Sequence, residues 1–340
     1  MRKPKLLILI LVTIYVAAFI TACTDDGNEE HTLTGTLTVY TSMRESLTND
    51  LVEGFTAIYP GITIETRVGG AGSLMREIEA ERESGAIKAD VIWTSEVPDF
   101  YHMKDNNLLL SYRPIGADTV FHSQSDADDY FIPARLGTLG IAYNTDLVST
   151  PPVSWHDLTG SDFANGFAIA NPATSGTAFI SVGLLMEIFG EQFFRSLHAN
   201  GAFVGQGSSQ VVDAVATGEL AACLAVDYMV FTHAEAGAPI AISYPPEMIV
   251  IPSPVAIFKN SPNQEIAKLF VDYLISSEAQ QIIANSGTLP VLTDIAVPGR
   301  FNVPTVTEAM VRSIQVNDNE MYMQKDELVA SFLTIMQYYD

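Results

Sequence analysis

The sequence predicts an α/β protein with two lobes, each built on a mostly parallel sheet with flanking helices. Three observations lead to this prediction. The chain has 340 residues, which is more than one small core needs and enough for two lobes of about 100–200 residues each. Segments typical of strands and helices alternate with short connections, as in parallel sheets with helical crossovers. A second alternating series begins after Arg135, so we expect one sheet in each lobe.

The N-terminal segment is typical of an export signal. Residues 1–5 carry three positive charges, and an almost wholly apolar run follows over 6–20. This run is shorter than the roughly 20 residues of a membrane span and suits a signal peptide. It ends in ITAC, which resembles the bacterial lipobox, where the cysteine carries lipid and begins the mature chain. We therefore expect a signal peptide over 1–22, a lipid anchor on Cys23 and an acidic tether over 23–35. An uncleaved anchor helix is the alternative.

The first alternating series follows the tether. We expect strands over 36–40, 62–68 and 89–93 and helices over 42–60 and 74–82. The first of these helices starts at Ser42 and has Glu45 three residues later, which is the spacing of a capping box. The second is opened by a glycine-rich turn over 69–73. Hydroxyls or glycines therefore follow every strand of this series.

The second series has the same pattern and is followed by a helical C-terminal part. We expect strands over 140–144, 167–170 and 220–226, and helices over 155–158, 178–189 and 207–217. An extended segment comes next, with helices after it: 250–258, 263–276, 277–286 and the amphipathic stretch from Thr305. Because no low-complexity linker separates the two series, we expect extended crossing strands to join the lobes.

The composition limits the partners. Asp and Glu number 40 against 17 Lys and Arg, a net charge of −23, which excludes a nucleic-acid backbone as partner. The same charge repels anionic lipid head groups, so lipid on Cys23 has to provide the membrane attachment. Two cysteines are too few for a disulfide scaffold or a four-ligand zinc site. Cys223 lies in an apolar run, where we expect an inert buried thiol in a monomeric protein.

Several segments, in order along the chain, resemble an ABC-transporter solute-binding protein of the ferric-iron, sugar-phosphate and phosphonate (2-aminoethylphosphonate-like) group. They are LTVYTS, GGAGSLMREIEAERESGAIKADVIWTSE, FIPARLGTLGIAYNTD, ANPATSGTAFISVG, VVDAVATGELAACLAVDY and SPNQEIAKLFVDYLISSEAQ. The resemblance covers nearly all of the mature chain. It implies a type II-like periplasmic-binding-protein fold with a two-segment hinge, in which lobe 1 holds 36–134 plus 250–340 and lobe 2 holds 135–249. It also implies a small-molecule ligand, an ABC permease in the cytoplasmic membrane as partner, and no cofactor.

Candidate ligand contacts follow from the rule that ligands sit beyond the carboxyl ends of parallel strands, near helix N-termini. After Ser175 the first acidic residue is Glu187, so no side-chain carboxylate competes with an anion for the free N–H groups of that helix. The alternative for each hydroxyl is that it only caps a helix. The rule selects Ser42, Gly72, Ser73, Thr94, Ser95, Thr174, Ser175, Gly176, Thr177 and Ser209.

Arg135 lies where the chain crosses between the expected lobes. Its guanidinium suits a phosphate group, which it can bind with two parallel hydrogen bonds. Alternatively, it pairs with Asp128 or Asp129.

Three further candidates come later in the chain. Asp227 and Tyr228 end an expected buried strand, where they could bind sugar hydroxyls or an amino group, although Tyr228 could instead belong to the core. Glu247 is placed near the ligand by the resemblance, and a solvated turn is the alternative.

The function expected from these residues is capture of a small phosphorylated or phosphonate solute by an importer's binding component. Ferric iron is the alternative solute, and Tyr228 and Asp227 would then coordinate it. The resemblance weakens this alternative, because the iron-binding members use adjacent tyrosines with a histidine near the first strand. In this chain the corresponding pair is Asp227 and Tyr228, and the first strand ends in Thr41 and Ser42 without a histidine. The sequence contains no G-x-S-x-G, H-E-x-x-H, complete G-x-G-x-x-G or Walker A motif, so we do not expect an enzyme. A ligand sensor or a periplasmic hydrolase is a remote alternative.

Overall fold

The computed structural model describes residues 33–120, 125–314 and 317–338. Contacts separate a short N-terminal unit that ends at Thr34 from a second unit, 35–340, and the fold given below is that of the second unit. The predicted signal peptide and the predicted lipid-bearing Cys23 lie outside the described residues.

A mixed nine-stranded sheet runs through this unit, in the order β2-β1-β3-β9-β4-β7-β5-β6, with β8 paired to β4. The strands are β1 Gly35–Thr41, β2 Ile62–Val68, β3 Val91–Trp93, β4 Ile132–Asn144, β5 Phe167–Ala170, β6 Phe203–Gly205, β7 Ala222–Val226, β8 Ile240–Ser243 and β9 Ile249–Ile257. The strands β2, β1 and β3 are parallel to one another, as are β7, β5 and β6. The alternation predicted one parallel sheet in each lobe, and the structure has a parallel group of strands for each series, but β9 and β4 join the two groups into one continuous sheet.

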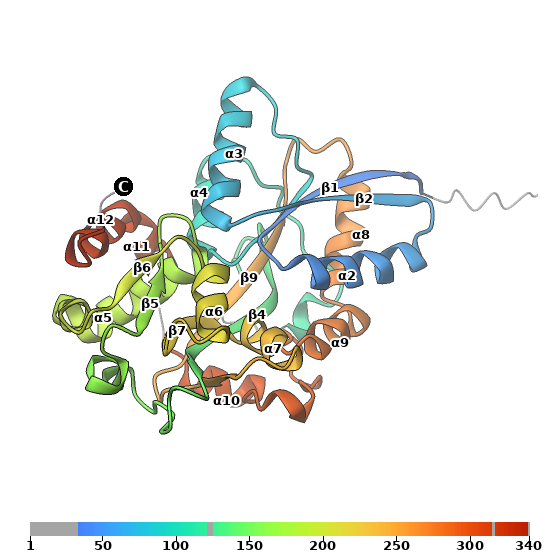
Figure 1. Ribbon diagram of the computed structural model, residues 1–340. Coiled ribbons are helices and arrows are strands. Elements are labelled where there is room, and N and C mark those ends of the chain that lie inside the picture. Colours follow the sequence, from blue (N-terminus) through green and yellow to red (C-terminus); the bar gives the residue numbers. More distant parts are fainter. Residues whose placement is uncertain (1–32, 121–124, 315–316, 339–340) are drawn as a thin grey trace, which may run out of the picture. The chain divides into compact units, whose positions relative to one another are not determined.

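Two long antiparallel strands, β4 and β9, join the parallel groups (Figure 1). They pair from Ile132 with Val255 to Leu139 with Ile249, and beyond Leu139 β4 continues alongside β7. Every residue of β9 is buried, and so is almost all of β4. Both faces are covered, so these strands are long apolar runs rather than alternating ones. They are the two crossing segments of a two-lobed type II fold.

Helices cover both faces of each parallel group (Figure 1). They are α2 Glu45–Ile58, α3 Ala71–Ser84, α4 Val97–Asp105, α5 Gly176–Ala199, α6 Ser208–Ala216, α7 Asp227–Glu235, α8 Gln264–Leu274, α9 Ser277–Asn285, α10 Val306–Arg312, α11 Asp318–Met323 and α12 Lys325–Ile335. Neighbouring strand residues serve opposite faces, as the pleat requires. Val39 packs with α2 and α8, whereas Tyr40 packs with α3 and α4.

The start of α2 differs from the prediction. The helix begins at Glu45 with Arg44 at its N-cap position and no side-chain cap, so the capping box predicted for Ser42 is wrong. Instead, Thr41 Oγ1 accepts the backbone N–H of Met43 at 3.1 Å. The backbone N–H of Ser42 donates to the carbonyl oxygen of Trp93. The chain therefore makes a further turn after β1 before the helix starts.

The span α5 consists of two helical segments, because Gly190 between them has φ +68° and is not helical. The first segment ends at this kink, next to the predicted end at residue 189, and the second segment, which continues to Ala199, was not predicted. Among the described residues, α5 is the one helix with the length and composition of a membrane span, and 56% of its apolar window is buried inside the protein. Its side chains Phe179 and Phe194 belong to the hydrophobic core.

The C-terminal helices pack across the fold. α12 lies against α5, where the rings of Phe332 and Phe194 meet edge to face at 5.3 Å. α11 lies against α4. The last helices therefore contact elements of both parallel groups. The lobe boundaries expected from the sequence stay a prediction.

Candidate ligand-binding pocket

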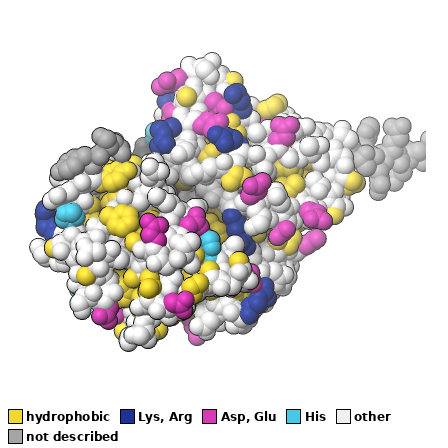
Figure 2. Space-filling model, in the orientation of Figure 1, with side chains coloured by type: hydrophobic (Ala, Val, Ile, Leu, Met, Phe, Trp, Pro, Cys, Tyr) yellow, Lys and Arg dark blue, Asp and Glu magenta, His cyan; other side chains and the backbone are white. Residues whose placement is uncertain are grey.

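A pocket of about 430 Å³ lies where strands of both parallel groups end. Figure 2 shows the surface hollowed between α3 and α6, whose first residues line the pocket. Most of the predicted contact residues meet here: Ser42, Ser73, Ser95, Arg135, Thr174, Ser175, Gly176, Thr177, Ser209 and Tyr228. Because the carboxyl ends of parallel strands share one sheet edge, residues far apart in the sequence converge at this point.

Three helices direct their N-termini at the pocket. α3 and α6 begin after Gly70 and Gly207, which leaves both N-termini without a side-chain cap. None of α3, α5 and α6 has an acidic residue in its first turn. Free N–H groups and the positive ends of three helix dipoles favour an anion in this space.

Ser175 caps α5, which was the alternative role considered for each predicted hydroxyl. It also belongs to a cluster of hydroxyl groups. Its Oγ accepts from the backbone N–H of Ala178 at 3.3 Å. The same oxygen lies 2.8 Å from Ser208 Oγ and 3.1 Å from Thr177 Oγ1. The cap is therefore part of a polar wall built from α5 and α6.

Arg135 is buried beside the pocket, with an exposed fraction of 2%. Its Nε donates to Ser253 Oγ at 3.3 Å, and its guanidinium carbon lies 5.1 Å from the centre of the Tyr228 ring. Burial lowers the pKa of Arg135, an effect that the nearby Tyr228 and Asp227 oppose, and an arginine keeps its charge in proteins. The structure thus places a cation at the pocket wall.

The alternative partners considered for Arg135 are occupied elsewhere. Asp128 pairs with Lys104 at 2.8 Å, and Asp129 pairs with Arg113 at 3.0 Å. The guanidinium of Arg135 forms no ion pair with either carboxylate.

A second arginine, Arg44, lines the pocket and was missed in the sequence analysis. Its guanidinium carbon lies 5.3 Å from the centre of the Tyr228 ring, so Arg44 and Arg135 both contact that ring. It donates to Thr232 Oγ1 and, at 3.2 Å, to the carbonyl oxygen of Ser286. Its Nε and the Oγ of Ser42 are buried and have no hydrogen-bond partner among the described residues. Its position in the turn after the first strand could have indicated a ligand contact. We had instead assigned this turn to the capping box predicted at Ser42.

Asp227 is not among the lining residues, although Tyr228 next to it is. Its carboxylate is fully buried and accepts from the backbone N–H of Thr138 at 3.2 Å, from the Thr138 hydroxyl and from the Tyr228 N–H at 2.6 Å. Burial raises the pKa of Asp227 to about 6, against the opposing effects of Thr138 and Arg135. The structure therefore places this carboxylate where it fixes the start of α7 and orients Tyr228.

Three other predicted residues are not among the lining residues either. Thr94 is fully buried, with no partner for its hydroxyl. Glu247 is half-buried, and its backbone oxygen accepts from the indole of Trp155 at 3.0 Å. Gly72 faces the chain before α5, where an added Cβ would lie 3.0 Å from the carbonyl oxygen of Ala173.

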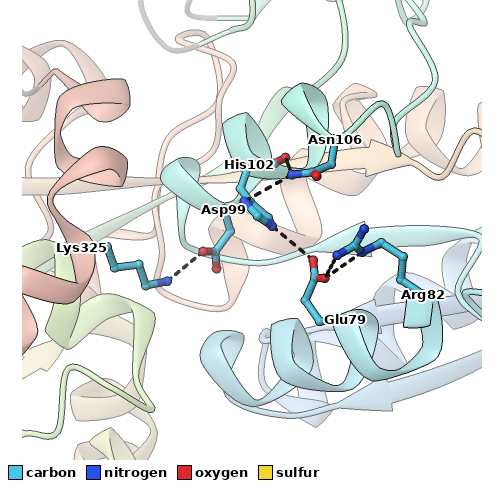
Figure 3. A network of polar contacts seen from close by, with 6 residues as sticks. All are labelled: Glu79, Arg82, Asp99, His102, Asn106 and Lys325. Atoms are coloured by element: carbon cyan, nitrogen blue, oxygen red, sulfur yellow. Dashed lines mark hydrogen bonds and ion pairs between the residues drawn. The ribbon is translucent and has the colours of Figure 1, made fainter. Parts of the chain in front are cut away.

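A buried ion cluster lies behind the α5 N-terminus. Lys325 Nζ lies 2.6 Å from Glu96 Oε2 and 2.8 Å from Asp99 Oδ1, and Figure 3 shows Lys325 pointing at Asp99 from the C-terminal helices. An added Cβ at Gly176 would lie 2.6 Å from Glu96 Oε1. The carboxylate of Glu96 is thus in direct contact with the backbone of a pocket residue.

The two residues expected to coordinate iron, Asp227 and Tyr228, do not both face the pocket. Within 33–120, 125–314 and 317–338, no three His, Cys, Asp or Glu residues gather as a metal cluster. Of the two expected iron ligands, Tyr228 lines the pocket, whereas Asp227 is hydrogen-bonded behind it. Two guanidinium groups beside the phenol disfavour a cation at that position.

A two-lobed α/β fold with a polar pocket between its parallel groups defines a solute-binding protein. The family of bacterial extracellular solute-binding proteins matches residues 40–281, and the chain belongs to this family. Membership implies export, a small-molecule ligand and an ABC permease as partner.

Individual relatives bind different solutes, according to their names. The chain is 26% identical over 273 residues to a putative 2-aminoethylphosphonate-binding periplasmic protein of Salmonella paratyphi A, covering 76% of this chain and 78% of the relative. It also resembles the structure of AfuA from Actinobacillus pleuropneumoniae with fructose-6-phosphate bound. That match has TM-score 0.79 and 23% identity, over 90% of this chain and 100% of the other. Iron-bound HitA from Pseudomonas aeruginosa matches with TM-score 0.75 and 22% identity, over 88% and 99%. All of these relatives are binding proteins.

Proposed function

We propose that this protein is the lipid-anchored binding component of an ABC importer that captures a small phosphorylated or phosphonate solute. One observation carries the proposal. Two guanidinium groups and three helix N-termini face a pocket that has no carboxylate among its described lining residues. This arrangement suits a dianion better than any other common solute group.

The proposed mechanism is closure around the bound anion. Arg44 contacts α7 and the end of α9, while Arg135 extends from β4, so a phosphate between them would contact several elements at once. A ligand that contacts both sides shifts an open–closed equilibrium towards the closed form. The glycine turn before α3 contacts the chain before α5 in the present conformation, which supports this account.

The proposed location is the outer face of the cytoplasmic membrane, with lipid on Cys23. The basic and apolar N-terminal segment and the cysteine that ends it support this proposal. Acidic side chains are spread over the face seen in Figure 2. An acidic body would not bind anionic membranes unaided.

The relatives support the phosphorylated or phosphonate class, because a 2-aminoethylphosphonate-binding protein and a fructose-6-phosphate complex are among them. The iron-bound neighbour keeps ferric iron as the competing ligand. The two arginines oppose iron, because they would repel a bare cation at Tyr228.

Calorimetric titration of the purified protein tests the proposal. We expect saturable binding of a hexose phosphate or a short alkylphosphonate, and none of ferric citrate. Mass spectrometry of solute released from the protein as purified would identify the natural ligand. Binding of ferric iron with no binding of any phosphate ester or phosphonate would overturn the proposal. Loss of uptake on deleting the partner permease would separate transport from sensing.

A further inference from the structure

We infer that the pocket selects a phosphate or phosphonate whose remaining part is uncharged and hydroxylated, and that it rejects one carrying an ammonium group. This inference rests on the proposed function and specifies the class of solute.

Within 33–120, 125–314 and 317–338, the lining contains two cations and no anion. Arg44 and Arg135 are the charged residues there, and none of the described residues that line the pocket is an aspartate or a glutamate. An ammonium group removed from water needs a carboxylate or several oxygen acceptors to offset its lost hydration. In this pocket it would instead meet two like charges.

Two carboxyl groups in contact with lining residues are already engaged. Glu96 contacts the backbone of Gly176 from behind, but its carboxyl group is held by Lys325 at 2.6 Å. Lys325 is shared with Asp99 at 2.8 Å. Asp227 accepts from the Thr138 hydroxyl, the Thr138 N–H and the Tyr228 N–H. Neither Glu96 nor Asp227 can turn to a ligand ammonium without breaking these contacts.

The aromatic ring at the pocket is engaged as well. Tyr228 is contacted by both guanidinium groups, with their central carbons 5.1 and 5.3 Å from the ring centre. An aromatic face can substitute for a carboxylate in binding ammonium groups. Here the two arginines already use the ring, so it offers no cage for a third cation.

The uncharged polar side chains of the lining suit hydroxyl groups, and they lie beside apolar residues such as Met43 and Met229. Ser209, Ser95 and the amide side chain of Gln206 line the pocket. Hydroxyl and amide groups both donate and accept hydrogen bonds, and so match a ligand hydroxyl in either role. The pocket volume of about 430 Å³ falls in the usual range for small-molecule sites, roughly 300–1,000 Å³.

Two matched ligand pairs test the selectivity by calorimetry on the full mature protein at one neutral pH. The pairs are 2-hydroxyethylphosphonate with 2-aminoethylphosphonate, and glucose 6-phosphate with glucosamine 6-phosphate. Within each pair, the first compound carries a hydroxyl group where the second carries an ammonium group. We expect the hydroxyl member of a binding pair to bind at least about tenfold more tightly. Equal or tighter binding of the ammonium member would overturn the inference but leave the proposed function intact. Binding of ferric iron with no binding of either pair or of any other phosphate ester or phosphonate would overturn the proposed function and this inference with it.

A variant tests the cause of the selectivity. Gln206→Glu adds a carboxylate to the lining with little change in shape. We expect the hydroxyl-to-ammonium affinity ratio to fall at least about fivefold in this variant. Gln281→Glu makes the same charge change on α9, outside the lining, and should leave the ratio unchanged. The same ratio in both variants would overturn the explanation by the missing carboxylate.

Discussion

Lys325 Nζ lies 2.6 Å from Glu96 Oε2, although the two residues are 229 positions apart in the sequence. This contact joins the start of α12 to the segment between β3 and α4, directly behind the α5 N-terminus. Lys325 also lies 5.1 Å from the centre of the Phe179 ring on α5. One side chain therefore connects the C-terminal helices to elements of both parallel groups.

Replacing Lys325 by methionine should destabilise the protein. The change leaves the buried carboxyl groups of Glu96 and Asp99 without their cation, and breaking a fully buried ion pair costs about 3–5 kcal/mol. Because the Lys325 side chain is 25% exposed, we expect about 2–3 kcal/mol in urea unfolding. The control Lys259→Met removes an exposed lysine that donates to Asn107 and should cost less than about 0.5 kcal/mol. Equal losses in the two variants would contradict a structural role for the Lys325 cluster.

The stability of the protein should depend on the protonation of Glu96. Burial and then the charge of Asp99 raise the pKa of Glu96 from 4.5 to about 8, against the effect of Lys325. The folded protein therefore retains a proton that the unfolded chain releases. The resulting stability is fully present below pH 4.5 and is lost as the pH rises to about 8.

Glu96→Gln removes this titration and isolates its effect. We expect the unfolding free energy of the unmodified protein, relative to the variant, to fall between pH 5 and pH 8 by on the order of a few kcal/mol. Urea unfolding at several pH values measures the difference. Parallel pH profiles for the two proteins would show that Glu96 does not titrate in this range.

Replacing Arg44 by glutamine should weaken ligand binding more than it weakens the fold. We expect at least about a tenfold loss of affinity for whichever phosphate ester or phosphonate binds, since a charge-assisted hydrogen bond contributes about 1.5–3 kcal/mol. Arg195→Gln makes the same charge change at a surface pair with Glu191 and should retain full affinity. If both variants bind as the unmodified protein does, Arg44 does not contact the ligand.

Replacing Asp227 by alanine should lower stability. Its carboxylate accepts hydrogen bonds from Thr138 and from the start of α7, so we expect a loss of about 2–4 kcal/mol. Asp146→Ala, at an exposed position, should change stability by less than about 0.5 kcal/mol. A lower affinity with an unchanged melting temperature would instead favour the direct ligand contact that the sequence suggested for Asp227.

Replacing Gly70 by alanine should hinder closure. A Cβ at Gly70 would lie 2.7 Å from the carbonyl oxygen of Thr174, too close for the present contact to persist. We expect at least about a tenfold weaker affinity and a nearly unchanged melting temperature without ligand. An added Cβ at Gly299 meets nothing within 4 Å, so Gly299→Ala is the control. Unchanged affinity in Gly70→Ala would mean that this contact is not required for binding.

The regular elements could be predicted well wherever the local pattern was strong. The bounds expected for β2 and β5 are those observed, Ile62–Val68 and Phe167–Ala170. Alternation and β-branched or apolar residues encode a strand within a few positions. The short elements β6 and α4 were not predicted, because three to nine residues carry too little pattern.

The site could be predicted only in part. Ser42, Tyr228 and most of the predicted hydroxyls and glycines line the pocket, because the ends of parallel strands converge in any such sheet. Arg44 was missed and Asp227 lies behind the wall, because a charged side chain contacts whichever partner the packing brings within a few ångströms. No local spacing encodes that partner.

The sequence by itself determined the alternation of strands and helices and the candidate export signal, because both are read from periodicity and composition over short stretches. Only the tertiary structure decided that two arginines flank one tyrosine, and that Glu96 and Asp227 are engaged away from the pocket. The physical reason is that burial patterns are local in sequence. Charge interactions depend on distance in space, and that distance is set only when β4 and β9 bring the two groups of strands together.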